Sequence, residues 1–470
     1  MERRIPLNTS AQSTIPGQTA TPPTAAPLPL LTCLGWGLGT LGLTAYMVGS
    51  YLLLRFMTDY MAIPAELAGF IFAGAKLYDG LVDPLFGSLS DRTRTRWGRR
   101  RPYMVGGAIA CGAIFALAFN LPIVTERNGA VAMLVFMLMA HATAYAAFAV
   151  PYMTLPAEMT TNPQERSKLM SFRVVNGSLG NLVGGSATAA LIAWFGGGLA
   201  GHRAMGIVVG FTIFAVLMTC VFLTRKAKLR EHDGAEHPPI TQQLRMAVAN
   251  RPFFTLQCAK LALLSAAAFH TASAPFFVQR RLALSDQTLA TIYLTLTIGT
   301  VLAQPLWLRA TRKFGKRRSY VAAGLFTACV WLSWLPLGPG SPYALVIAIG
   351  LMAGLGNGGI VLISQSMLPD TMEYQFLTTG KRIEGSFAGL YIMVEKLGQA
   401  IGASLTGIAL GLFGYISSSG GKTVAQPDSA ITGVVLSYCV FSTCFLLLSV
   451  AIMAFYPLDE RTMQLRKGKA

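Results

Sequence analysis

Long apolar stretches recur from residue 30 almost to the end of this chain, and they limit its possible folds more than any other feature. A stretch of about 20 such residues crosses a bilayer as an α-helix. A composition of 53% hydrophobic and 12% charged residues exceeds what a water-soluble core needs. We therefore predict an all-α membrane protein with about twelve spans. These begin near Leu30, Leu67, Tyr103, Val131, Met170, Met205, Phe253, Gln287, Tyr320, Tyr343, Ser386 and Thr432.

Basic residues collect in every second loop and predict the orientation of the chain. Loops rich in Lys and Arg stay on the cytoplasmic side of a membrane. Both termini are therefore expected in the cytoplasm, and the chain is expected to be a multi-pass protein of the plasma membrane (a bacterial inner membrane). The net charge of +18 then needs no nucleic-acid partner. The basic clusters cover residues 92–101, 225–251, 309–318, 381–382 and 461–469.

A polar linker over residues 225–251 divides the expected spans into two halves, and a short amphipathic helix is expected near its end. The sequence after span two, at residues 83–103, is faintly repeated after span eight, at residues 304–320. Two related six-helix bundles are typical of secondary transporters. The expected bundles cover residues 30–224 and 252–457, flanked by a disordered tail over 1–29 that is not a signal peptide and a tail over 458–470.

Two carboxylates, Asp79 and Asp83, lie four residues apart inside the second expected span, and Lys76 precedes them by three residues. An acid in hydrocarbon costs roughly 2.5–3.5 kcal/mol, so it is retained where it faces a polar cavity, a partner or an ion. The spacing places all three side chains on one helix face. Two close carboxylates are costly to keep ionised together, which favours binding of a coupling cation. A static ion pair with Arg173 or Lys396 is the structural alternative.

Two sequence blocks stand out beside the expected spans. The first is Gly87–Pro102, with Asp91, Arg92 and Trp97-Gly98-Arg99-Arg100-Arg101, and the second combines Leu368–Tyr374, Thr379–Gly385 and Glu395–Ala400. With these blocks, the chain over residues 30–460 resembles the glycoside-pentoside-hexuronide:cation symporters of the major facilitator superfamily, to which melibiose permease belongs. The resemblance implies twelve transmembrane helices in two pseudo-symmetric six-helix bundles, and cation-coupled symport by alternating access.

The resemblance also assigns roles to single residues. Asp79 and Asp83 match the cation-site acids of the family. Lys396 matches its functional lysine in span eleven, and Tyr145 and Arg173 match residues that line its sugar cavity. Asp79 and Asp83 are therefore the expected cation-coupling residues. The expected substrate-binding residues are Lys76, Tyr145, Arg173 and Lys396.

Departures from the family pattern affect the expected ion and substrate. Leu43 or Thr44, and Ala149, stand where melibiose permease has the acids that hold its sugar. Val82 and Ala146 stand where that relative supplies further side-chain oxygens, and a sodium site needs several oxygen ligands. The sequence therefore favours H+ over Na+ as the coupling ion, and no cofactor or metal centre is expected.

Charged residues near the loops are expected to control the conformational change. Asp91, Arg92, Arg99 and Arg100 are expected to form a cytoplasmic network that holds the halves together when the outside is open. The expected partners in the second half are Asp370, Glu373, Arg382 and Glu384, and by resemblance Glu158 and Arg166 are gate charges of the superfamily.

The substrate is not determined by such a fold. The basic residues Lys76, Arg173 and Lys396 favour an anionic glycoside or uronide, whereas neutral oligosaccharides, an amphiphile or lysolipid, or a non-transporting sensor are alternatives. No phosphate-binding GxxxxGK[ST], zinc-binding HExxH or nucleophile GxSxG pattern supports enzyme activity. The expected partners are a small molecule, a cation and the bilayer, and the protein is expected to be a monomer.

Three further residues and the cysteines complete the expectations. His141, one turn before Tyr145, either relays protons or is a packing residue held by a hydrogen bond. The same two alternatives apply to His270. Lys260 is expected near the membrane edge. The seven cysteines lie in expected spans without CxxC spacing, so neither disulfides nor a zinc site is expected.

Overall fold

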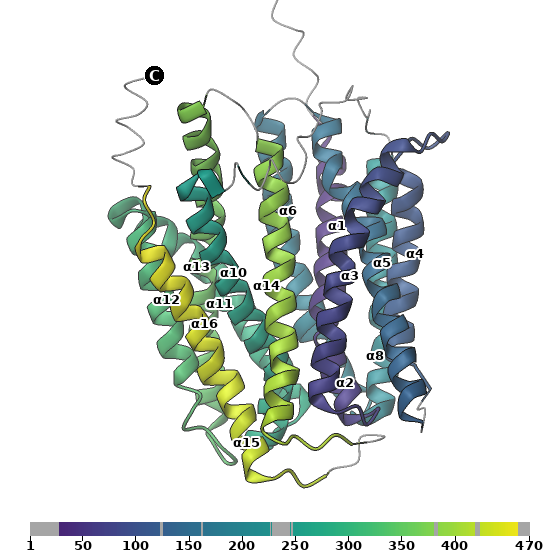
Figure 1. The fold of residues 1–470 in the computed structure, drawn as a ribbon, viewed down its shortest axis with the longest axis vertical. Helices are drawn as coiled ribbons and strands as arrows, with labels where there is room; N and C mark the ends of the chain where they lie inside the picture. The colour runs from purple at the N-terminus through teal and green to yellow at the C-terminus, as the bar shows by residue number, and fades with distance from the viewer. Residues whose placement is uncertain are drawn as a thin grey trace, which may run out of the picture.

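The computed structural model describes residues 28–122, 126–160, 163–225, 227, 245, 248–379, 384–418 and 424–458. Within these residues the helices form two groups that stand side by side, one from each half of the sequence (Figure 1). This arrangement confirms the predicted all-α fold of two six-helix bundles. Most of the predicted linker and both predicted tails lie outside the described residues.

The first half contains six described spans, and its first and fifth spans are built from consecutive helical segments. The fifth span passes through a wider π-helical turn, η1. The segments are α1 (Leu30–Gly49) with α2 (Leu52–Asp59), α3 (Ala65–Arg92), α4 (Arg101–Ala118), α5 (Arg127–Met159), α6 (Pro163–Asn181) with η1 (Leu182–Ala187) and α7 (Thr188–Trp194), and α8 (Gly198–Thr224).

The second half also contains six described spans. Its first and last spans include π-helical segments, η2 and η3. The segments are α10 (Arg251–Phe276) with η2 (Phe277–Arg281), α11 (Asp286–Phe314), α12 (Lys316–Leu332), α13 (Tyr343–Thr379), α14 (Glu384–Leu412), and α15 (Asp428–Val435) with η3 (Leu436–Phe441) and α16 (Ser442–Ala454).

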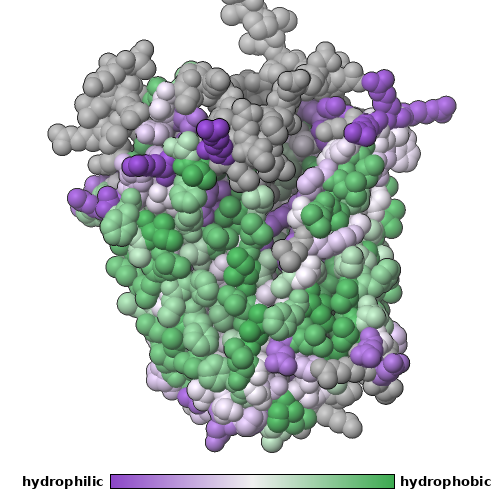
Figure 2. Space-filling view, in the orientation of Figure 1, coloured by the Kyte–Doolittle hydropathy of each residue, from purple (hydrophilic) through white to green (hydrophobic). Residues whose placement is uncertain are grey.

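The two ends of the bundle can be distinguished by the helices they hold. We call the end at which α1 begins and α16 finishes the terminal end (Figure 1). The opposite end, where α2 and α15 lie, is the far end. Figure 2 shows apolar side chains over the middle of one face and hydrophilic residues toward both ends. Phe136 and Phe211 are among the exposed large apolar side chains, which are suited to contact with lipid.

Eight of the described helices are long and apolar enough to cross a membrane by length and composition alone. The other four spans have identifiable reasons for failing that measure. The helix α12 has 17 residues, and α6 begins with a polar segment. The helices α3 and α14 carry the ionisable residues of the candidate site, and these residues lower the mean hydropathy of both helices.

Glycines let α3 and α14 meet across the boundary between the halves. A Cβ atom at Gly69 would lie 2.6 Å from the carbonyl oxygen of Ser404, and one at Gly407 would lie 2.5 Å from that of Ala65. Larger residues would therefore push the backbones apart, as is usual where small residues bring transmembrane helices together. This close approach positions the ionisable residues of α3 opposite those of α14.

Candidate functional site

The predicted acids meet a basic residue of the other half at the middle of the bundle. Lys396 on α14 donates a hydrogen bond from Nζ to Oδ2 of Asp83 on α3. The same Nζ lies 3.7 Å from Oδ1 of Asp79. The structure therefore contains the ion pair with Lys396 that the sequence left as the structural alternative. Lys396, Asp79 and Asp83 together link the two halves.

Lys76 adds a second positive charge on the same helix face as the acids. Its Nζ lies 3.7 Å from Oδ2 of Asp79, as the spacing of three residues predicts. The Asp79 side chain is 3% exposed and that of Lys76 is 30% exposed, so the ammonium group is the more accessible of the two. An isolated buried carboxylate is strongly unfavourable, and Lys76 and Lys396 compensate its charge.

One oxygen of each carboxylate accepts no hydrogen bond. The Oδ1 atoms of Asp79 and Asp83 are buried and have no hydrogen-bond partner. Buried acceptors without partners are rare in folded proteins and call for a proton, an ion or a donor group. The cluster can therefore bind a cation through these oxygens, with Lys396 as the competing positive charge.

Aromatic side chains from α1 and α5 lie next to this cluster. The Tyr145 ring centre is 5.2 Å from Nζ of Lys396. Tyr46 stacks on Tyr145 with ring centres 6.2 Å apart and on His141 with ring centres 4.0 Å apart. The predicted Tyr145 and Lys396 are thus brought together, beside a stack of rings that can pack against an apolar face of a ligand.

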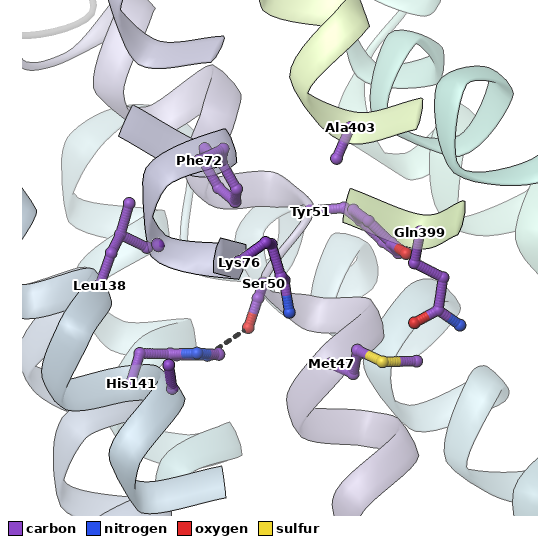
Figure 3. Close-up of a pocket in the computed structure, with 11 residues that line it drawn as sticks. Met47, Ser50, Tyr51, Phe72, Lys76, Leu138, His141, Gln399 and Ala403 are labelled. Carbon is purple, nitrogen blue, oxygen red and sulfur yellow. Dashed lines mark hydrogen bonds between the residues drawn. The ribbon is translucent and has the colours of Figure 1, made fainter. Parts of the chain in front are cut away.

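A small enclosed cavity of about 40 Å³ lies on the far-end side of this cluster. One water needs at least about 10–15 Å³ on this measure, so the cavity has room for a few waters or one small substituent of a ligand. Figure 3 shows Lys76 beside Ser50, with Gln399 reaching in from the other half. The lining residues are Met47, Ser50, Tyr51, Phe72, Ala75, Lys76, Leu138, His141, Ala142, Gln399 and Ala403.

Hydrogen bonds orient His141 in this cavity. Ser50 donates from Oγ to the carbonyl oxygen of Tyr46, 2.5 Å away. Its single proton is then used, so the 2.6 Å contact between Ser50 Oγ and His141 Nε2 requires the imidazole to donate. His141 therefore combines a packing role with a position on the cavity wall. His270, by contrast, is stacked between Trp331 and Tyr438, with ring centres 4.3 and 4.0 Å away.

Arg173 and Lys260 lie near the same region, from α6 and α10. Arg173 is partly buried and interacts electrostatically with Tyr145. Lys260 is 5% exposed, and its Nζ lies 3.0 Å from Oε2 of Glu395. The packing of α10 against α14 encloses this side chain. The expectation that Lys260 lies near the membrane edge stays a prediction.

The predicted gate charges of the first half form a cluster at the terminal end. Arg99 donates from Nη2 to Oε1 of Glu158 at 2.7 Å, and Arg100 donates from Nε to the same oxygen at 2.6 Å. Arg100 also donates from Nη1 to Ser90 Oγ at 3.1 Å. Arg92 is exposed. The two arginines thus share an acid on α5, within their own half.

The predicted partners in the second half are only partly described. Asp370 on α13 accepts from Nζ of Lys316 at 2.6 Å, also within one half, and Glu373 is exposed on the same helix. Arg382 lies outside the described residues. The side chains of Asp91, Arg166 and Glu384 are likewise not described, so their gating roles stay predictions.

Sequence reasoning missed an ion-pair network that joins the halves at the far end. Arg55 on α2 donates from Nη1 to Oδ1 of Asp286 on α11 at 2.6 Å, and both side chains are buried. Arg280 on η2 donates from Nη2 to Oδ2 of Asp59 at 3.3 Å. We call these four residues the far-end lock. Arg55 and Asp59, four residues apart in an apolar stretch, were the available sequence signal.

The loop before α15 strengthens the far-end lock. Tyr415 donates from its hydroxyl to Oδ1 of Asp59 at 2.9 Å and accepts from Nε of Arg280 at 3.2 Å. The backbone N–H of Ser418 donates to the carbonyl oxygen of Thr58 at 2.8 Å. Each charged side chain of the lock therefore makes at least one hydrogen bond, which helps a buried ion pair to be tolerated. Arg55 Nε is buried without a hydrogen bond, 3.7 Å from Oδ2 of Asp59.

Comparison with known proteins identifies the family. Residues 33–460 match the model of a family described as MFS/sugar transport protein. The chain belongs to the glycoside-pentoside-hexuronide:cation symporter family of the major facilitator superfamily. Membership confirms the resemblance noted in the sequence and establishes a multi-pass membrane transporter, not an enzyme.

Two curated relatives of this transporter resemble it over most of both chains. A glucuronide carrier protein homolog of Escherichia coli (strain K12) is 27% identical over 442 residues, covering 92% of this chain and 93% of the relative. An isoprimeverose transporter of Lactiplantibacillus pentosus is 26% identical over 418 residues, covering 88% and 85%. These relatives are named as carriers of sugars or sugar acids.

Solved structures share the fold of this transporter. A bacterial homolog of the human lysosomal transporter Spinster, in an inward-facing and unoccupied conformation, matches with a TM-score of 0.67 and 13% identity. The match covers 93% of this chain and 97% of that chain. At this identity, the likeness supports the major facilitator fold alone.

Proposed function

We propose that this transporter is a proton-coupled symporter that carries a glycoside or uronide by alternating access. The observation that supports this most directly is the bond from Lys396 to Asp83, together with the approach of Lys396 to Asp79. This cluster joins the halves that must move relative to each other. A ligand that changes the cluster can therefore change the equilibrium between conformations.

The proposed coupling ion is a proton bound by Asp79 and Asp83. Neutralising one carboxylate weakens its attraction for Lys396, and the lysine is then available for a negatively charged or hydroxyl-bearing substrate. Symport requires that the ion and the substrate each raise the affinity for the other. The side chains of Val82 and Ala146 supply no oxygen, which favours a proton over sodium.

The proposed substrate class follows from the charges around the cluster. Lys76, Arg173 and Lys396 provide positive charge, and the Tyr145 ring provides a flat apolar surface. A sugar carrying a carboxylate matches both features, because its ring packs on aromatic faces and its anion pairs with basic groups. The name of the glucuronide carrier protein homolog agrees with this class.

The proposed orientation places the terminal end in the cytoplasm, as the basic loops favour. The far-end lock then closes the extracytoplasmic side. Asp91, Arg92, Arg99 and Arg100, with Glu158, Arg166, Asp370, Glu373, Arg382 and Glu384, belong to the cytoplasmic side in this orientation. We propose that these residues engage across the halves when the extracytoplasmic side opens, and that the protein works as a monomer.

Uptake into proteoliposomes tests the proposal. Labelled glycosides, uronides and lysolipids would be offered with an imposed proton or sodium gradient, to the native chain and to Asp79→Asn and Asp83→Asn. Proton-driven accumulation of a glycoside or uronide that either substitution abolishes supports the proposal. Sodium drive would replace the ion, lysolipid movement would replace the substrate class, and absence of flux would indicate a sensor.

A further inference from the structure

Glu395 is the one charged residue of α14, within the part of this helix that the structure describes, to which neither the family resemblance nor the proposed coupling cycle gives a role. It immediately precedes Lys396 on α14. Successive residues of a helix point about 100° apart. Lys396 therefore turns toward α3 and its acids, whereas Glu395 turns toward Lys260 on α10.

The two members of this pair differ in exposure. The Glu395 side chain is 38% exposed, and that of Lys260 is 5% exposed. Lys260 is further held by the Tyr391 carbonyl oxygen at 3.3 Å and lies over the Tyr391 ring. The lysine is thus a fixed, buried support, while the carboxylate presents part of its surface outward with acceptor capacity to spare.

The position of Glu395 on α14 indicates what this surface faces. Residues four apart lie on the same face of a helix, and Gln399 and Ala403 follow Glu395 at intervals of four. Both line the cavity in Figure 3. Glu395 therefore lies one turn toward the terminal end on the same face, and it also interacts electrostatically with Tyr51 and Tyr145 of the first half.

We propose that Glu395 is a substrate-binding acid that accepts hydrogen bonds from hydroxyl groups of the sugar, held in place by Lys260. This inference rests on the proposed function. The positions in the first half where melibiose permease has its sugar-holding acids are occupied by apolar or neutral residues, with buried Leu43 and Ala149 among them. A carboxylate from α14 supplies the missing acceptor from the opposite half, next to the lysine that binds the substrate anion.

The geometry divides the recognition of one sugar between adjacent residues. Lys396 meets the anionic substituent, and Glu395 meets hydroxyl groups on another edge of the same ring. Carboxylates form strong charge-assisted hydrogen bonds with hydroxyl donors. Lys260 is a positioning residue, because its ammonium group fixes the carboxylate without itself being open to the ligand.

A double-mutant cycle with sugar analogues tests this assignment. Binding of labelled methyl β-D-glucuronide, its 2-, 3- and 4-deoxy analogues and methyl β-D-glucoside would be measured on the full chain in lipid nanodiscs. Proton-driven accumulation of the parent sugar would be measured in proteoliposomes. The variants are Glu395→Gln, the double variant Lys260→Met/Glu395→Gln, and the control Glu126→Gln, which makes the same change at an exposed acid of the far end. The double variant removes the buried charge that Glu395→Gln alone would leave unpaired.

We expect one deoxy analogue to bind the native chain about 10- to 100-fold more weakly than the parent sugar, the effect of losing a hydrogen bond to a charged group. Both Glu395 variants should bind the parent sugar more weakly by a similar factor and should no longer distinguish that analogue from it. Glu126→Gln should behave as the native chain does.

Three results would overturn the assignment, and they differ from one another. Unchanged discrimination among the analogues in the Glu395 variants would mean that the carboxylate does not contact the sugar. Native affinity combined with lost proton-driven accumulation would make Glu395 a proton site instead. Failure of the native chain itself to bind methyl β-D-glucuronide or methyl β-D-glucoside would instead reject the proposed function on which the assignment depends.

Discussion

Arg55 Nη1 lies 2.6 Å from Asp286 Oδ1, and this contact joins residues 231 positions apart across the two halves of the transporter. Both side chains are at most 9% exposed. Removing one partner of a buried pair leaves an uncompensated charge, at a cost of about 3–5 kcal/mol. In an alternating-access protein this cost is largely confined to the conformation in which the pair forms.

We predict that Arg55→Met shifts the equilibrium toward the form that is open at the far end, by a factor of 100 or more on the cost of about 3–5 kcal/mol. Spin labels at exposed Glu126 and Asp428, one in each half near the far end, would report a longer distance. The exchange Arg55→Asp with Asp286→Arg should restore the short distance. An unchanged distance in Arg55→Met would show that the pair does not control closure.

The pair in the middle of the bundle has a different expected signature. Lys396→Met leaves the partly buried Asp83 without its cation and should lower thermal stability. Lys396→Met with Asp83→Asn should recover most of that stability, since replacing both members of an ion pair in the protein interior is often neutral. Thermal unfolding in one detergent would measure both variants. Equal destabilisation by the single and double variants would argue against an energetic link between the two side chains.

The shared acid of the terminal end gives a third prediction. Glu158→Gln leaves the guanidinium groups of Arg99 and Arg100 without their common anion. We expect destabilisation of about 1–3 kcal/mol, the range for a broken hydrogen bond to a charged group. Thermal unfolding would measure it, with Glu66→Gln at an exposed acid of α3 as the matched control. A variant as stable as this control would contradict the role.

The glycine contact between α3 and α14 gives a fourth prediction. Gly69→Val should abolish uptake, because its side chain would meet the backbone of α14, where even a Cβ comes within 2.6 Å of the Ser404 oxygen. Gly74→Val, on the same helix with nothing within 4 Å of the added Cβ, is the matched control. Equal uptake by the two variants would mean that close approach of these helices is dispensable.

The sequence predicted those parts of the site that depend on local spacing. Lys76, Asp79 and Asp83 share a face of α3 because helical geometry requires it, and the pairing of Lys76 with Asp79 follows directly. The resemblance to the family added Lys396, a residue of the second half of the chain, to the predicted site. The fold was predictable for a similar reason, since the length and order of apolar stretches restrict a membrane chain to few arrangements.

The far-end lock was not predictable in the same way. Arg280 and Asp286 lie at the ends of spans, where charged residues are common, and nothing local indicates that they meet Asp59 and Arg55. Their contacts arise only when the two halves pack together. The burial and pairing of Lys260 were missed for a related reason, because its partner Glu395 lies 135 residues away on another helix.

A tilt of α3 against α14 about the close contact at Gly69 would have its largest effect far along α3 from that contact. Asp83 lies 14 residues along α3 from Gly69, which corresponds to a lever arm of about 20 Å at 1.5 Å per residue. A tilt of about 10° between the helices would displace Asp83 by about 3.5 Å relative to Lys396. A small rotation at a backbone contact is thus amplified into the full separation of an ion pair, so the pair responds to the relative tilt of the halves long before the helices lose contact.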